Sequence, residues 1–243
     1  SKRKADAEWK AKVDSDPKLK AEIGDPWTEI EKIQAERAAL YKRFTMTEGR
    51  AGFGSSLFGY ARAILRAAEE KTKPNAERLR EYADARLPLL EKNILDARPV
   101  YREVEELKLR FWFTKIREEL TADAPETALF LGKESPDALA KSLAQSKLDD
   151  PAFRKTLWDG GMAAVKASAD PMIQYVLKID AAGRAVRKEA EERIEGPTAR
   201  ATERIAKAYF AAHGTSVYPD ATFSLRISYG KITGWTYRDQ AIT

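Results

Sequence analysis

The sequence contains no cysteine, a single histidine and no long apolar run. Without cysteine the chain has no disulfide, no thiolate nucleophile and no cysteine-ligated metal. No apolar stretch approaches the ~18–20 residues that a membrane-spanning helix requires, so we expect no membrane insertion. With His213 as the only imidazole, a transition-metal site is disfavoured. We therefore expect neither a metal nor a cofactor.

An excess of charge of one sign is also missing. Lys and Arg number 43 and Asp and Glu number 38, a formal net charge of +5. The signs alternate, as in Glu29, Glu31 and Lys32, which is typical of solvated helix faces. Nucleic-acid binding needs a concentrated basic surface, so we expect no nucleic-acid partner. A basic nucleic-acid binder stays as an alternative, and steeply salt-dependent binding would mark it.

Short polar residues followed by proline recur along the chain and predict helix starts. The polar side chain accepts hydrogen bonds from free N–H groups, and proline fits the first helical position. These pairs are Asp16-Pro17, Asp25-Pro26, Ser135-Pro136, Asp150-Pro151 and Asp170-Pro171. With 43% hydrophobic and 33% charged residues, the chain is predicted to be mostly α, a multi-helix domain of about eight to ten helices.

Glycine and proline predict where the helices are interrupted. The stretch Thr47–Gly54 breaks one helix, and Ser55 or Ser56 caps the next. Lys73-Pro74-Asn75 and Pro99 are each predicted to open a further helix. Gly196-Pro197 interrupts the long helix that starts at Pro171, and Gly214 ends the last one.

The last residues read as β-structure. Residues 222–229 alternate, with Phe223, Leu225, Ile227 and Tyr229 on one face, which is typical of a half-buried strand. Gly230-Lys231 is predicted to turn the chain into a second strand over residues 232–237. We expect a truncated C-terminal β-hairpin that opens a larger sheet. The predicted domains are 1–214, helical, and 215–243, β.

No residue pattern predicts a catalytic site within the chain. His213 lies where a helix ends before a glycine, a position that favours a capping or surface role over catalysis. Gly52-Phe-Gly-Ser-Ser56 lacks the lysine of a phosphate loop, and G-x-S-x-G is absent. We expect the chain itself not to be an enzyme.

Several segments nevertheless resemble one family of enzymes. Pro219-Asp-Ala-Thr-Phe-Ser-Leu-Arg-Ile-Ser-Tyr-Gly230 is similar to a segment of the bacterial chymotrypsin-fold dipeptidyl aminopeptidases, the family of dipeptidyl peptidases seven and eleven. There it leads from an inserted helical domain into the second β-barrel. Ser56–Arg62, Lys73–Tyr82 and Leu131–Pro136 resemble one branch of that family.

The resemblance implies a non-catalytic fragment of a serine dipeptidyl aminopeptidase that is periplasmic or secreted. In the family the catalytic His and Asp precede the helical domain and the Ser follows it, so no triad residue falls in this chain. A leader is expected upstream of Ser1. The implied partners are a peptide substrate and the catalytic barrel lobes of the same parent chain. A dimer through the C-terminal hairpin stays open.

In the family the helical domain caps the catalytic cleft and restricts it to peptide N-termini, in part through an Asn on one helix. The segment that matches this helix, Leu57–Arg62, has no Asn. Our candidates for facing substrate are Phe58, Tyr60 and Arg62; core packing of the two aromatic rings and a solvated Arg62 remain the alternative. The rival function is a stand-alone helical protein-interaction module without a peptidase role.

Overall fold

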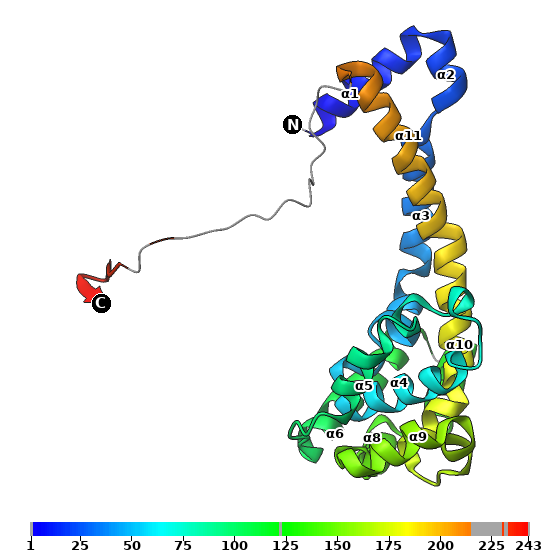
Figure 1. The fold of residues 1–243 in the computed structure, drawn as a ribbon, viewed down its shortest axis with the longest axis vertical. Helices are drawn as coiled ribbons and strands as arrows, with labels where there is room; N and C mark the ends of the chain where they lie inside the picture. The colour runs from blue at the N-terminus through cyan, green and yellow to red at the C-terminus, as the bar shows by residue number, and fades with distance from the viewer. Residues whose placement is uncertain (1, 122, 215–229, 231–232, 243) are drawn as a thin grey trace. The chain divides into compact units, whose positions relative to one another are not determined.

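A computed structural model of the chain describes residues 2–121, 123–214, 230 and 233–242, and helices predominate in them (Figure 1). The predicted mostly α class is confirmed. The chain divides into two compact units. One consists of residues 27–201, and the other combines residues 1–26 with 202–243. The predicted division into 1–214 and 215–243 stays a prediction.

Most of the helices belong to the unit of residues 27–201. They are α3 (Pro26–Phe44), α4 (Ser56–Glu70), α5 (Leu87–Leu95), α6 (Arg102–Glu119), α7 (Pro125–Leu131), α8 (Pro136–Leu143), α9 (Pro151–Ala167) and α10 (Pro171–Ala190). The other unit contains α1 (Lys2–Ser15), α2 (Pro17–Ile23), most of α11 (Gly196–His213), and the strands β1 (Trp235–Tyr237) and β2 (Gln240–Ile242).

The helix starts predicted from a short polar residue followed by proline are confirmed. Asp16, Ser135, Asp150 and Asp170 each accept hydrogen bonds from backbone N–H groups in the first turn of the helix that follows. In each of these helices proline occupies the first position, where its missing N–H costs nothing. Local chemistry at each helix start therefore decided these boundaries.

Two helices differ from the prediction. The segment after Lys73 forms short 3₁₀ turns, Asn75–Glu77 and Arg80–Tyr82, instead of an α-helix. Side chains hold it in this form: Arg78 donates to the Lys73 carbonyl, and the Asp84 N–H donates to the Asn75 side chain. The helix expected from Pro99 begins at Arg102, so Pro99 lies in the preceding link.

The core of the larger unit is built around Trp112 on α6, which is fully buried. Its indole N–H donates to the Met46 carbonyl at 2.8 Å. Its ring contacts those of Phe58, Phe113 and Phe130, with centroids 4.8, 4.9 and 5.8 Å away. The run Phe111-Trp-Phe113 is helical, and two of its three rings, those of Trp112 and Phe113, are core.

The predicted interruption at Gly196-Pro197 takes the form of a π-helical turn. α10 runs into the π segment Glu191–Glu195, and α11 begins at Gly196. Pro197 has no N–H, and in an α-helix its ring would collide with the carbonyl four residues earlier. The wider π turn accommodates the proline without ending the helix.

A two-stranded antiparallel hairpin is present near the C-terminus, with Trp235 opposite Ile242. The predicted strand over 222–229, Lys231 and the start of the predicted second strand lie outside the described residues. Thr233 and Gly234, which were predicted to belong to the second strand, are described without strand structure, and β1 begins at Trp235. Its partner is β2, and the turn is Arg238-Asp239, both with positive φ (47° and 60°). Such a turn was missed because Asn-Gly, and not Arg-Asp, is its usual signature.

Candidate functional site

The link between α3 and α4, residues 45–54, lies at the centre of the candidate site, and we call it the α3–α4 break. It consists of a π turn, Thr45–Gly49, and a 3₁₀ turn, Ala51–Gly54. Gly52 has a φ of 77°, and a Cβ there would lie 2.4 Å from Cδ1 of Phe58. Glycine is thus required for the backbone to lie against the Phe58 ring.

The start of α4 is fixed to α6 by a buried carboxylate. Glu105, 2% exposed, accepts from the Ser55 hydroxyl at 2.6 Å and from the Leu57 N–H at 3.1 Å. The Ser55 hydroxyl also caps the helix by accepting from the Phe58 N–H. A carboxylate near a helix N-terminus is favoured by the free N–H groups and the helix dipole. These bonds hold the α3–α4 break and α4 in a defined geometry.

A buried ion-pair network joins the break to α4 and α10. The Arg66 guanidinium donates to both carboxylate oxygens of Glu48 at 2.6 and 2.7 Å, and to Asp180 at 2.7 Å. Burial alone would raise the pKa of Glu48, but the hydrogen bonds and charge of Arg66 hold it below its usual range. Gly183 leaves room for Glu48, since a Cβ there would lie 2.9 Å from Oε2.

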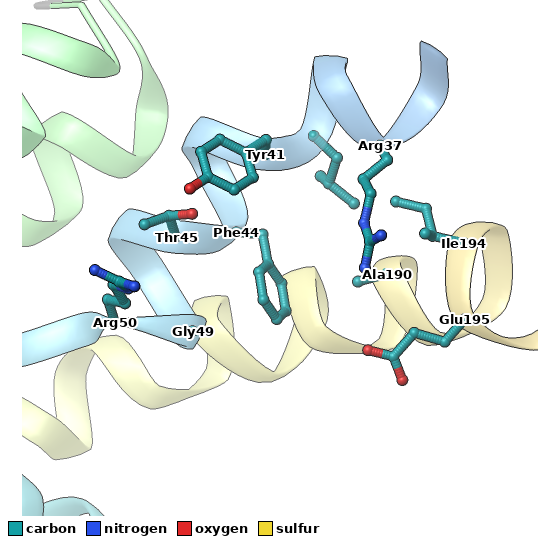
Figure 2. A pocket seen from close by; sticks show the side chains of 10 residues that line it. Arg37, Tyr41, Phe44, Thr45, Gly49, Arg50, Ala190, Ile194 and Glu195 are labelled. Carbon is teal, nitrogen blue, oxygen red and sulfur yellow. The ribbon is translucent and has the colours of Figure 1, made fainter. Parts of the chain in front are cut away.

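Two surface pockets, each of about 460 Å³, adjoin the break and share Gly49 and Arg50. The first lies between α3 and the π turn after α10 (Figure 2). Its apolar lining comes from Leu40, Phe44, Ala190 and Ile194, and its polar groups from Arg37, Tyr41, Thr45, Arg50 and Glu195. The second is lined by the break itself together with Phe58, Gly59 and Arg62.

The structure brings two of the three predicted residues together. Phe58 is 2% exposed, and its ring packs on Trp112 while also lining the second pocket. Arg62 lies over the Phe58 ring, 5.3 Å from its centroid, and donates to the Glu48 carbonyl at 3.0 Å. Tyr60 lies elsewhere, with the Arg154 guanidinium 4.0 Å from its ring centroid. Phe58 and Tyr60 therefore both contribute to packing.

Arg50 was not singled out from the sequence. Its side chain is exposed between the two pockets, and among the described residues it has no ion-pair partner. The sequence feature that could have pointed to Arg50 is a single cationic residue within a glycine-rich stretch, Gly49-Arg-Ala-Gly-Phe-Gly54. An uncompensated guanidinium at the edge of a pocket is well suited to contacting a carboxylate or a peptide carbonyl.

His213 lies in the smaller unit and is engaged by aromatic rings. The Trp9 indole N–H donates to His213 Nε2 at 3.0 Å, and the Tyr209 ring lies 4.9 Å from the imidazole. His213 itself is exposed, in keeping with the capping or surface role expected from its position. Within the described part of the chain, no group of three or more His, Cys, Asp or Glu side chains could hold a metal ion.

Comparison with known proteins identifies the class. The family model for peptidase S46 matches residues 1–243, and the chain belongs to this family. One relative is an Asp/Glu-specific dipeptidyl-peptidase of Shewanella putrefaciens, 27% identical over 222 residues. The match covers 87% of this chain and 30% of the relative, so the chain spans less than a third of that protein's length. No helix in the described ranges is long and apolar enough to cross a membrane.

Proposed function

We propose that residues 1–243 form the non-catalytic helical part of a longer serine-type dipeptidyl aminopeptidase of the S46 family. One observation carries the proposal: a chain matched along its full length by the family spans only 30% of its dipeptidyl-peptidase relative. The position of His213 among aromatic rings supports it, because a serine triad would need that imidazole beside a carboxylate and a nucleophile.

In this proposal the helical part caps the catalytic cleft of the longer protein and limits entry to peptide N-termini. A cap can exclude water when closed and can gate turnover by its motion without contributing to the chemistry. The α3–α4 break, with Arg50, Phe58 and Arg62 around one pocket, is the surface that we place toward the peptide. We propose that the longer protein is periplasmic or secreted, as its resemblance to the dipeptidyl aminopeptidases implies.

A rival function is a helical interaction module without a peptidase role. Exposed apolar side chains on α6, among them Leu107 and Phe111, favour a role in protein contact. In the capping proposal the same side chains serve contact within the longer peptidase. The two functions differ in one observable, which is hydrolysis of peptides by the longer protein.

Arg50→Gln in the longer peptidase tests the placement of this surface. Loss of an exposed guanidinium that contacts the peptide should lower kcat/KM on free-amine dipeptidyl substrates about tenfold, the worth of one charge-assisted hydrogen bond. Arg86→Gln, an exposed arginine at the start of α5, is the matched control and should stay within about twofold. Equal activity of Arg50→Gln and the unaltered enzyme would remove the α3–α4 break from the peptide path.

A further inference from the structure

An exposed apolar face on α6 is not used by the core of the larger unit. Tyr101, at the N-cap, and Val104, Leu107 and Phe111 on the helix are 64%, 43%, 54% and 48% exposed. Their spacing of three, three and four residues places them along one side of the helix. We call these four residues and Phe53 the α6 stripe. α6 is drawn in green in Figure 1.

The opposite face of α6 already supplies the core. Leu109, Trp112, Phe113 and Ile116 are each 0% exposed. A surface helix of a globular domain normally carries one apolar stripe, whereas a helix that is apolar on both sides is covered on both. Four large side chains in a row also exceed the scattered single apolar residues that surfaces usually show. The exposed side chains of the stripe, from Tyr101 to Phe111, are therefore not required for the packing of this unit, whereas Phe53 is partly buried against its core.

Phe53 extends the stripe from the α3–α4 break at a conformational cost. Its backbone has φ 45° and ψ 43°, a left-handed conformation that bulky residues rarely adopt. Its ring nevertheless meets the edge of Phe111, with centroids 5.3 Å apart. Strain of this kind persists where the surroundings or a function require it. The stripe is thus continuous with the surface around Arg50.

We propose that the α6 stripe is the surface on which the remainder of the longer peptidase docks. This inference rests on the proposed function. The occupant is a segment tethered in the same polypeptide, because the curated relative is more than three times as long as its matched part. That segment presents apolar side chains to Tyr101, Leu107 and Phe111.

The size of the stripe favours a tethered partner over a second copy. Stable interfaces between separate chains use roughly 20–30 residues on each side, and the stripe offers five. A partner in the same polypeptide is present at an effective concentration in the millimolar range, so a small apolar contact is sufficient. Contacts between domains of one chain are accordingly smaller than those between permanent subunits.

Cysteine accessibility tests the inference directly, because the chain has no cysteine of its own. Leu107→Cys is made in residues 1–243 and in the longer peptidase, and maleimide labelling is followed by mass spectrometry of the peptide carrying the new thiol. Arg117→Cys, exposed on another side of α6, is the control. We expect Leu107→Cys to label at least tenfold more slowly in the longer protein, and Arg117→Cys to change less than twofold.

Equal labelling of Leu107→Cys in both proteins would overturn the docking surface. Protection that already appears in residues 1–243 and grows with protein concentration would assign the stripe to a second copy, and would also overturn it. Peptidase activity of the longer protein is measured on the same samples. A protected thiol in an inactive longer protein would therefore contradict the proposed function and leave the docking surface standing.

Discussion

At the scale of single residues, the most consequential group is Arg66, whose side chain is 4% exposed between Glu48 and Asp180. Arg66→Met removes the one cation that both buried carboxylates share. Asp180 keeps its bond to Arg184, but Glu48 keeps only Arg62 and Arg187, 3.7 and 4.0 Å away, so the free energy of unfolding should fall by about 3–5 kcal/mol. Lys188→Met removes an exposed ion pair with Glu192 and should change it by less than about 0.5 kcal/mol. Urea denaturation measures the free energy of unfolding of both variants. A loss of less than about 1 kcal/mol for Arg66→Met would mean that the ion-pair network around Arg66 is not needed for stability.

Glu70 should make stability depend on pH in the acid range. Burial raises the pKa of its carboxyl, but hydrogen bonds from Lys73, the Leu79 N–H and Arg184 outweigh burial and lower the pKa from 4.5 to about 2. The folded pKa lies below the unfolded one, so this stabilisation is complete above about pH 4.5 and is lost as the pH falls toward 2.

Glu70→Gln should therefore flatten the decline of unfolding free energy between about pH 4.5 and 2, besides lowering stability at neutral pH. Glu103→Gln, an exposed carboxylate on α6, should leave the profile unchanged. The measurement is thermal unfolding across that pH range. A Glu70→Gln profile as steep as that of the unaltered chain would contradict the assigned role of the carboxylate.

At the scale of elements, two helical glycines should respond in opposite directions to alanine. In Gly183→Ala the Cβ would lie 2.9 Å from Glu48 Oε2 and 3.0 Å from the Thr47 carbonyl, so the variant should lose about 1–3 kcal/mol. Beyond the backbone of its own helix and its chain neighbours, a Cβ added at Gly59 would meet nothing within 4 Å, so Gly59→Ala should gain about 0.5–1 kcal/mol. Thermal unfolding of the two variants measures these changes in stability. If both Gly183→Ala and Gly59→Ala were stabilised, α10 would not need to approach Glu48 closely.

The helix boundaries could be predicted because their causes are local. Asp16, Ser135, Asp150 and Asp170 cap the helices that begin directly after them, and the sequence shows each cap beside its proline. The same reasoning was wrong for the segment after Lys73, because hydrogen bonds that span more than one helical turn, such as Asp84 N–H to the Asn75 side chain, decide its form. A helix boundary can be predicted from the sequence when the residues within one turn of it determine it. It cannot be predicted when hydrogen bonds from farther along the chain determine it.

At the scale of the whole molecule, the candidate site was only partly predictable. Phe58 and Arg62 are four residues apart on α4 and meet, as helical spacing requires, whereas Tyr60 at the intermediate position turns to Arg154. Arg50 joins them only because the α3–α4 break bends the chain, a geometry set by Gly52 and by the buried Glu48. Sequence periodicity holds no information on such a bend.

Under the proposed function, this chain is the non-catalytic helical part of a longer dipeptidyl peptidase. The most direct test of this claim is hydrolysis of paired fluorogenic peptides, one with a free N-terminus and one N-blocked, by the longer protein and by residues 1–243 in parallel. We predict that the longer protein cleaves the free-amine peptide alone and that residues 1–243 cleave neither. Hydrolysis by residues 1–243, or equal cleavage of both peptides by the longer protein, would contradict the claim.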